Sequence, residues 1–219
     1  DVARACGIDT VKVALGTYYP TGFSIANSCF FAEAGNDRTA SFDIPDSLVL
    51  LGGYPSGGGA ESDRDWECNK TILCGDIGIP GDPTDNSYHV VTTFNVDSAT
   101  MVNGFCIQDG FANGEGDDIT IRSGAGWFNF SDSGSYSNPT ILNCTFINNK
   151  AIHRGGGLYN VADVKGNASP KIIGCFFISD SAENGGAMYN YGDDTANASP
   201  YVVNTVFAGN QADDGGAVL

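Results

Sequence analysis

The side chains best suited to acid–base chemistry gather in one short segment, which holds Lys150, His153 and Arg154. A polysaccharide lyase needs such a base beside acidic groups or Ca²⁺, all on one outward face. The equivalent positions in the next two repeats, aligned as described below, hold Ser181, Glu183 and Asn184, and then Gln211, Asp213 and Asp214. An isolated active site could have this pattern, but we favour a solvated turn whose positive charges offset acidic neighbours. We therefore assign no catalytic residue.

Acidic loops are the second group of candidate functional residues, because carboxylates in glycine-rich backbone can bind Ca²⁺. The candidate metal ligands are Asp117 with Asp118, and Asp193 with Asp194. Neither pair matches an EF-hand loop or the glycine-rich nonapeptide repeat that binds Ca²⁺, so exposed turn carboxylates are the alternative for each. The cysteine–histidine spacing of a zinc site is absent from the sequence. Calcium is thus the one cofactor that the sequence suggests.

Charge and hydropathy restrict the partners of the chain. Its 219 residues include 26 acidic and 10 basic side chains, which give a formal net charge of −16. Long-range repulsion makes nucleic acid and anionic membrane surfaces poor partners for such a surface. No apolar run reaches the length of a transmembrane helix, so we expect no membrane insertion. Sustained helical spacing of apolar residues is also lacking, which predicts strands and turns.

A repeat of about 30 residues organises the second half of the chain. Glycine-led segments begin at Gly124, Gly155, Gly185 and Gly215, and apolar blocks occupy 141–147, 172–178 and 202–208. The glycine-led segments start 31, 30 and 30 residues apart. A helix-free repeat of this length is too short for a βαβ unit but fits one coil of a parallel β-helix. Each strand would then pair with its copy one coil on, about 4.8 Å away.

The apolar blocks predict what fills the coils. We expect Phe146, Phe177 and Phe207 to stack inside as an aromatic ladder. Alternation along each block predicts the same inner side for Leu142 and Cys144, Ile173 and Cys175, and Val203 and Thr205. The turns that follow carry aligned short polar side chains at Asn149, Asp180 and Asn210. We expect this polar row to bond turn backbone from coil to coil.

The first part of the chain follows the same pattern less regularly. Strand-like runs occur at 11–14, 41–44, 48–51, 71–74 and 89–94, and acid-rich loops with glycine and proline at 54–70 and 75–87. We therefore predict one β-helix domain over residues 1–219, with irregular coils over 1–99 and regular repeats over 100–219. Leu219 falls within a repeat and solenoids need caps, so we expect the protein to continue beyond it.

Seven cysteines are an odd number, so at least one is free or pairs outside this segment. Cys6, Cys29 and Cys68 lie in irregular sequence and are the better disulfide candidates, and among them we select Cys6 and Cys29. The others lie in strand-like runs and should behave as small buried hydrophobes: Cys74, Cys106, Cys144 and Cys175. Cysteine usage therefore does not settle the compartment.

Two recurring patterns, Pro-x-Ile-x-Asn-Cys-x-Phe and Gly-Gly-x-x-Tyr-Asn, resemble those of right-handed parallel β-helix repeat proteins, as does the opening run at 11–20. These proteins include polymorphic outer-membrane-protein-like repeats and large secreted surface proteins of Bacteroidota. The resemblance implies an all-β, right-handed parallel β-helix in an extracellular or cell-surface protein. For Bacteroidota it also implies O-glycosylation at Asp-Ser/Thr triplets, whose acceptors here are Thr10, Ser47, Ser98, Ser181 and Thr195.

The same coil serves adhesins, lyases and filaments, so the fold alone leaves the function open. We favour a structural or adhesive module of a bacterial cell-surface or filament-forming protein, without catalysis. The alternative is a carbohydrate-active β-helix, either a polysaccharide lyase or a glycan-binding module. Its mark would be an open groove along one sheet with aligned aromatic and basic residues. Expected partners are another copy, another surface protein, or glycans, and Phe176 with Val206 should form an apolar contact spot.

Overall fold

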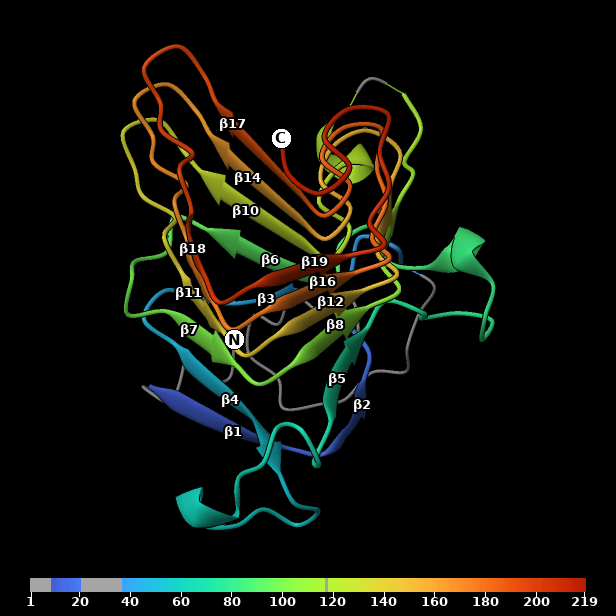
Figure 1. The fold of residues 1–219 in the computed structure, drawn as a ribbon, viewed down its shortest axis with the longest axis vertical. Coiled ribbons are helices and arrows are strands. Elements are labelled where there is room, and N and C mark those ends of the chain that lie inside the picture. The colour runs from blue at the N-terminus through green and yellow to red at the C-terminus, as the bar shows by residue number, and fades with distance from the viewer. Residues whose placement is uncertain (1–8, 21–36, 117) are drawn as a thin grey trace.

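The computed structural model describes residues 9–20, 37–116 and 118–219, which form stacked coils of parallel strands (Figure 1). Sheet A orders β1 (Thr10–Ala14), β4 (Val49–Tyr54), β7 (Met101–Asn103), β11 (Thr140–Leu142), β15 (Lys171–Ile173) and β18 (Tyr201–Val203). Sheet B orders β2 (Gly16–Tyr18), β5 (Thr71–Cys74), β8 (Cys106–Gln108), β12 (Thr145–Ile147), β16 (Phe176–Ile178) and β19 (Val206–Ala208). Sheet C orders β3 (Phe42–Asp43), β6 (Val91–Phe94), β10 (Trp127–Ser131), β14 (Leu158–Ala162) and β17 (Met188–Gly192). A short sheet D pairs β9 (Phe111–Ala112) with β13 (Lys150–Ala151).

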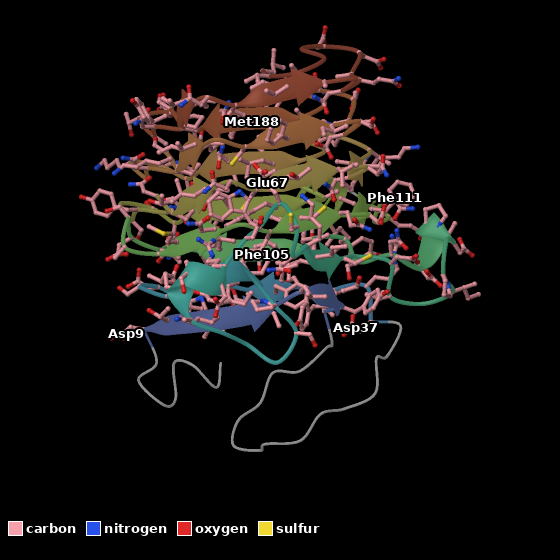
Figure 2. All side chains as sticks on the ribbon, turned by 60° about the horizontal axis from the view of Figure 1, so that its bottom comes forward. Asp9, Asp37, Glu67, Phe105, Phe111 and Met188 are labelled. Atoms are coloured by element: carbon pink, nitrogen blue, oxygen red, sulfur yellow. The ribbon has the colours of Figure 1, made fainter. Side chains whose placement is uncertain are left out.

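The chain passes through sheets A, B and C in turn, and each turn is one coil of a parallel β-helix. Ile141 of β11 pairs with Ile172 of β15, which pairs with Val202 of β18, so equivalent positions stack in register. Figure 2 shows the coils piled in chain order, from blue to red. Over the described residues, helical structure is limited to three 3₁₀ turns, η1 (Glu61–Asp63), η2 (Pro83–Asp85) and η3 (Thr120–Arg122). The predicted all-β, parallel β-helix fold is confirmed.

Stacked apolar side chains fill the interior. The ring centroids of Phe146 and Phe177 lie 4.4 Å apart, and those of Phe177 and Phe207 lie 5.1 Å apart, with planes inclined by only 2° and 13°. Cys144 and Cys175 are fully buried beside them. The predicted aromatic ladder is therefore confirmed, and these two thiols do act as small core residues. The same prediction was wrong for Cys106, which is half-buried and lines an outer pocket.

Each apolar block bends instead of forming one strand. β11 and β12 belong to different sheets, as do β15 and β16, and β18 and β19. The residue that begins each corner has a positive φ, at 49° for Asn143, 65° for Gly174 and 50° for Asn204. Glycine and asparagine tolerate this left-handed conformation better than most residues, which explains their presence at these positions.

Because of the corner, the inward-facing residue before it lies one position earlier in each block than simple alternation predicts. Ile141, Cys144 and Phe146 are fully buried in the fourth coil, whereas Leu142 is only half-buried. The prediction that Leu142, Ile173 and Val203 face inward was therefore wrong. Strict alternation holds only along a continuous strand, and the corner interrupts it.

The polar row after sheet B behaves as predicted. The Nδ2 atom of Asn149 donates to the Ile107 carbonyl at 3.1 Å, and that of Asn210 donates to the Phe177 carbonyl at 2.9 Å. Between them, Asp180 Oδ1 accepts from both the backbone N and Nδ2 of Asn149 at 2.9 Å. The row links successive coils through the turn backbone and is buried at Asn149 and Asp180.

A second polar row runs inside sheet C. Asn129 donates to Asn160 at 3.0 Å, and Asn160 donates to Asn190 at 2.9 Å. Thr93 continues the row by donating to Asn129 at 2.8 Å, and it accepts from Trp127 Nε1 at 2.8 Å. Because buried amides are costly without partners, this in-register chain of donors and acceptors keeps the coils aligned.

The irregular first part of the chain forms regular coils with long loops. The predicted strands at 11–14, 41–44, 48–51, 71–74 and 89–94 correspond to β1, β3, β4, β5 and β6. Residues 55–70, hereafter loop 55–70, connect β4 to β5 and contain η1. Loop 55–70 folds outside the corner between sheets A and B, and it supplies the side chains of the site described next.

Candidate functional site

The basic segment does not form one catalytic group. His153 Nδ1 lies 2.9 Å from the Glu183 carboxylate, and the Lys150 ammonium lies 5.4 Å from the centroid of the Phe111 ring. The Arg154 guanidinium lies instead over aromatic rings of sheet C, described below. The three side chains thus have separate partners, which fits a solvated turn with local counter-charges better than a shared active site.

The candidate metal ligands cap turns. Asp118 accepts from the backbone N and the hydroxyl of Thr120 at 2.9 and 2.6 Å, and Asp193 accepts from the backbone N of Asp194 at 2.8 Å. Asp117 lies outside the described residues. Within the part of the chain that the structure describes, no three His, Cys, Asp or Glu side chains are grouped to hold a metal ion. Calcium binding stays a prediction.

The remaining sequence candidates are spread over the surface or lie in undescribed segments. Of the glycosylation candidates, Thr10, Ser47, Ser98 and Thr195 are exposed and Ser181 is half-buried. Cys6 and Cys29 lie outside the described residues, so their proposed pairing stays a prediction. Cys68, the third irregular cysteine, is exposed and free.

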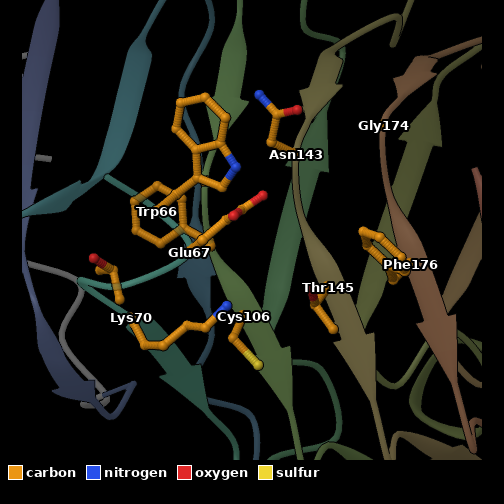
Figure 3. Close-up of a pocket in the computed structure, with 11 residues that line it drawn as sticks. Trp66, Glu67, Lys70, Cys106, Asn143, Thr145, Gly174 and Phe176 are labelled. Carbon is orange, nitrogen blue, oxygen red and sulfur yellow. The ribbon is translucent and has the colours of Figure 1, made fainter. Parts of the chain in front are cut away.

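A pocket of about 160 Å³ opens on the outer side of sheet B, and we name it the Trp66 pocket (Figure 3). Its lining residues are Trp66, Glu67, Lys70, Thr71, Gly104, Phe105, Cys106, Asn143, Thr145, Gly174 and Phe176. Figure 3 shows the side chains from loop 55–70 on one side and Phe176 on the other, with Asn143 and Thr145 between them. Cys106, Thr145 and Phe176 form one outward row across β8, β12 and β16.

Tight packing fixes Trp66 over the corner between the sheets. A Cβ placed on Gly53 would lie 2.8 Å from the Trp66 backbone, and one on Gly104 would lie 2.9 Å from the Trp66 Cβ. Both glycines have positive φ, 92° and 82°. Only glycine therefore allows loop 55–70 to approach this closely, and the close contacts fix the backbone and Cβ of Trp66.

Polar contacts fix the rest of loop 55–70. Arg64 donates to the carbonyls of Gly52 at 2.7 Å and Asn103 at 3.0 Å, and its guanidinium lies 4.9 Å from the centre of the Trp66 ring. Asp65 Oδ1 accepts from the backbone N atoms of Glu67 and Cys68, both at 2.9 Å. These bonds to the carboxylate lower the pKa of Asp65, the bond from Cys68 most.

The chemistry of the Trp66 pocket suits binding better than catalysis. Burial raises the pKa of the Cys106 thiol to about 11, against a smaller opposing effect of Lys70, so the thiol is not a nucleophile at neutral pH. Glu67 is the single carboxylate in the lining, whereas hydrolysis of a glycosidic bond ordinarily uses two. What remains is two aromatic walls with amide, hydroxyl, carboxylate and ammonium groups between them.

The outer face of sheet C carries aligned aromatic rings. Phe128, Tyr159 and Tyr189 pair in register across β10, β14 and β17, with ring centroids 5.7 Å apart at each step. A second row two residues further on contains Phe94, Phe130 and Tyr191. The Arg154 guanidinium lies 5.2 Å from the ring centres of both Tyr189 and Tyr191. Phe128 and Tyr159 are buried, with exposed fractions of 4% and 1%, whereas Tyr191 and Phe94 are 37% and 50% exposed, so only part of this aromatic alignment reaches solvent.

Sequence reasoning missed most of the Trp66 pocket. The place of Phe176 in the repeat predicts an exposed side chain, and it is 45% exposed. Trp66, Glu67 and Lys70 lie in a loop that no repeat covers, so no pattern assigned them a position. The available signal was a tryptophan in a polar, glycine-rich loop, where an indole needs a binding partner or a packing surface.

The stacked parallel strands define the class of this protein as a parallel β-helix repeat protein, and its candidate binding residues lie on the outer faces of the sheets. Residues 143–161 match the family described as the Chlamydia polymorphic membrane protein (Chlamydia_PMP) repeat. The match covers β12, β13, all but the last residue of β14, and part of the Trp66 pocket, and it points to a surface or outer-membrane protein. The comparisons with curated proteins and with solved structures gave no match. None of the described helices is long and apolar enough to cross a membrane.

Proposed function

We propose that this chain is a structural or adhesive module of an extracellular bacterial surface protein, and the resemblance to surface proteins of Bacteroidota supports the surface location. The polymorphic membrane protein repeat supports a surface role. The filled interior supports it too, because stacked apolar side chains occupy the centre of the described coils. Any partner must therefore bind an outer face.

The observation that carries the proposal is the number of large rings on the outer faces of an otherwise acidic protein. Tyr136, Tyr201, Phe94 and Phe176 have exposed fractions of 64%, 61%, 50% and 45%. Exposed aromatic side chains supply much of the binding energy at recognition surfaces, because a large ring leaves water at a low entropic cost.

A carbohydrate-active role is the second candidate, and the accessible rings of Tyr189 and Tyr191 beside Arg154 favour it. Within this candidate we prefer glycan binding to polysaccharide cleavage, since the basic side chains of the segment 150–154 have separate partners. Self-association through Phe176 and Val206 is a further proposal, supported by their exposed fractions of 45% and 47%.

Adhesion can be tested with beads that carry the purified chain. The beads are incubated with cultured epithelial cells and with polysaccharide-coated plates, and beads that carry serum albumin, another acidic protein, serve as the control. We expect more attachment than albumin gives on at least one surface. Attachment at the albumin level on both surfaces would overturn the adhesive function.

A further inference from the structure

We propose that the Trp66 pocket binds one ring of a neutral saccharide, with the rest of the glycan extending along the outward row of sheet B toward Val206. The proposal rests on the adhesive function and gives it a ligand class. A volume of about 160 Å³ is below the range of about 300 to 1,000 Å³ that drug-sized ligands occupy, so the pocket suits a single small ring.

The walls of the pocket match the apolar faces of a sugar ring. Trp66 is half-buried and Phe176 is 45% exposed, so each presents ring surface to a ligand. A pyranose has a C–H face that packs on aromatic rings while its hydroxyls point to the sides. Thr145 lies between Cys106 and Phe176 in the outward row, about 4.8 Å from each, which places a polar group beneath the ligand.

The polar groups of the pocket are available for hydroxyls. Asn143 uses its Nδ2 to donate to Asn103 at 3.1 Å, which leaves its Oδ1 as an acceptor. Across the described residues, the carboxylate of Glu67, the ammonium of Lys70 and the hydroxyl of Thr145 have no hydrogen-bond partner in the protein. Together these groups supply donors and acceptors side by side, the combination that vicinal hydroxyls require.

The charges of the pocket and of the whole chain favour a neutral ligand. Glu67 and Lys70 contribute one negative and one positive charge to the lining, so the pocket has no net charge of its own. The whole chain carries −16, which repels polyanionic glycans at long range. An uncharged saccharide avoids this cost and still uses both charged groups as hydrogen-bond partners.

Calorimetric titration tests the ligand class directly. The probes are neutral tetrasaccharides of glucose, galactose, mannose and N-acetylglucosamine, with tetragalacturonate and a tetra-alanine peptide as the competing classes. A change in tryptophan emission reports the site, because Trp66 is accessible and Trp127 is fully buried. We expect at least one neutral tetrasaccharide to bind and to change this emission.

Variants then locate the binding. Trp66→Ala should abolish it, and Phe176→Ala and Thr145→Val should each weaken it by about three- to tenfold. The matched control is Ile79→Ala, which shortens an apolar side chain that is 65% exposed and does not line the pocket, and it should leave binding unchanged. Circular dichroism and thermal unfolding check that each variant is folded. If Trp66→Ala does not fold, the binding of Phe176→Ala and Thr145→Val tests the proposal.

The proposal is overturned if no neutral tetrasaccharide binds, if only tetragalacturonate or the peptide binds, or if Ile79→Ala weakens binding as much as Phe176→Ala. The bead assay separates this failure from failure of the adhesive function. Wild-type beads that attach without any saccharide binding would leave adhesion standing and remove the pocket from it. Saccharide binding without bead attachment would support the pocket and overturn the adhesive function.

Discussion

Replacing Asp180 by asparagine should stabilise the protein above neutral pH. Asp180 is fully buried, and its Oδ2 atom has no hydrogen-bond partner. A Cβ on Gly157 would lie 2.9 Å from this Oδ2, just as one on Gly126 would lie 2.9 Å from Asn149 Nδ2. The Asp180 oxygen thus occupies the place where the neighbouring coil has an amide donor, and asparagine would restore that donor.

Burial raises the pKa of Asp180 from 3.8 to about 7, and the bonds from Asn149 only partly oppose this. A raised pKa in the folded state means that the proton is held more tightly there. The associated stability is therefore full below about pH 4 and is lost as the pH rises through about 7. The loss corresponds to at most about 4 kcal/mol by pH 8, and relaxation around the carboxylate would reduce it.

Urea denaturation at pH 5 and at pH 8 measures the effect. Asp180→Asn should be more stable than the wild type by about 2 to 4 kcal/mol at pH 8, with a smaller difference at pH 5. The control is Asp213→Asn, an exposed carboxylate at the surface, which corrects for the change in net charge. A gain that does not grow between pH 5 and pH 8, or that Asp213→Asn reproduces, would refute the argument.

Phe177→Ala should lower the free energy of unfolding by about 3 to 5 kcal/mol, because it empties the middle of the aromatic column. Urea denaturation should show a smaller loss for Phe207→Ala at the half-buried outer end, and equal losses would contradict the packing argument. The double variant His153→Ala with Arg154→Ala should release unsaturated uronate from polygalacturonate at the same level as the wild type, because the two side chains make separate contacts. Loss of a measurable activity in this variant would argue for an enzyme. Light scattering with Ca²⁺ present and chelated should show self-association that Val206→Asp reduces, whereas a strictly monomeric wild type under both conditions would count against it.

Much of the fold could be predicted because each coil of a solenoid must satisfy the same packing requirements as its neighbours. Every coil must present the same interior to the next, so the sequence shows the spacing of the glycine-led segments and the phenylalanines of the ladder. The strand at Thr71–Cys74 was predicted at its observed bounds even in the irregular part. Short, in-register strands with β-prone apolar residues need little more than local pattern to be recognised.

The corners could not be read in the same way. The block at 141–147 has the appearance of one strand, and only its division between sheets A and B places Ile141 inside in place of Leu142. The positive φ of Asn143 is the local cause, but asparagine also occurs in many ordinary turns, so the residue type alone does not reveal a corner.

The sequence by itself determined the period of the coil, the parallel stacking and the polar row at Asn149, Asp180 and Asn210, because these follow from repetition. The tertiary structure alone decided the state of Asp180 and the Trp66 pocket. Burial, which raises the pKa of Asp180, depends on the coils above and below it. Trp66 and Phe176 are far apart in the chain and in different coils, and they line one pocket only because loop 55–70 folds back over the stack. Long-range packing of this kind leaves no periodic trace in a sequence.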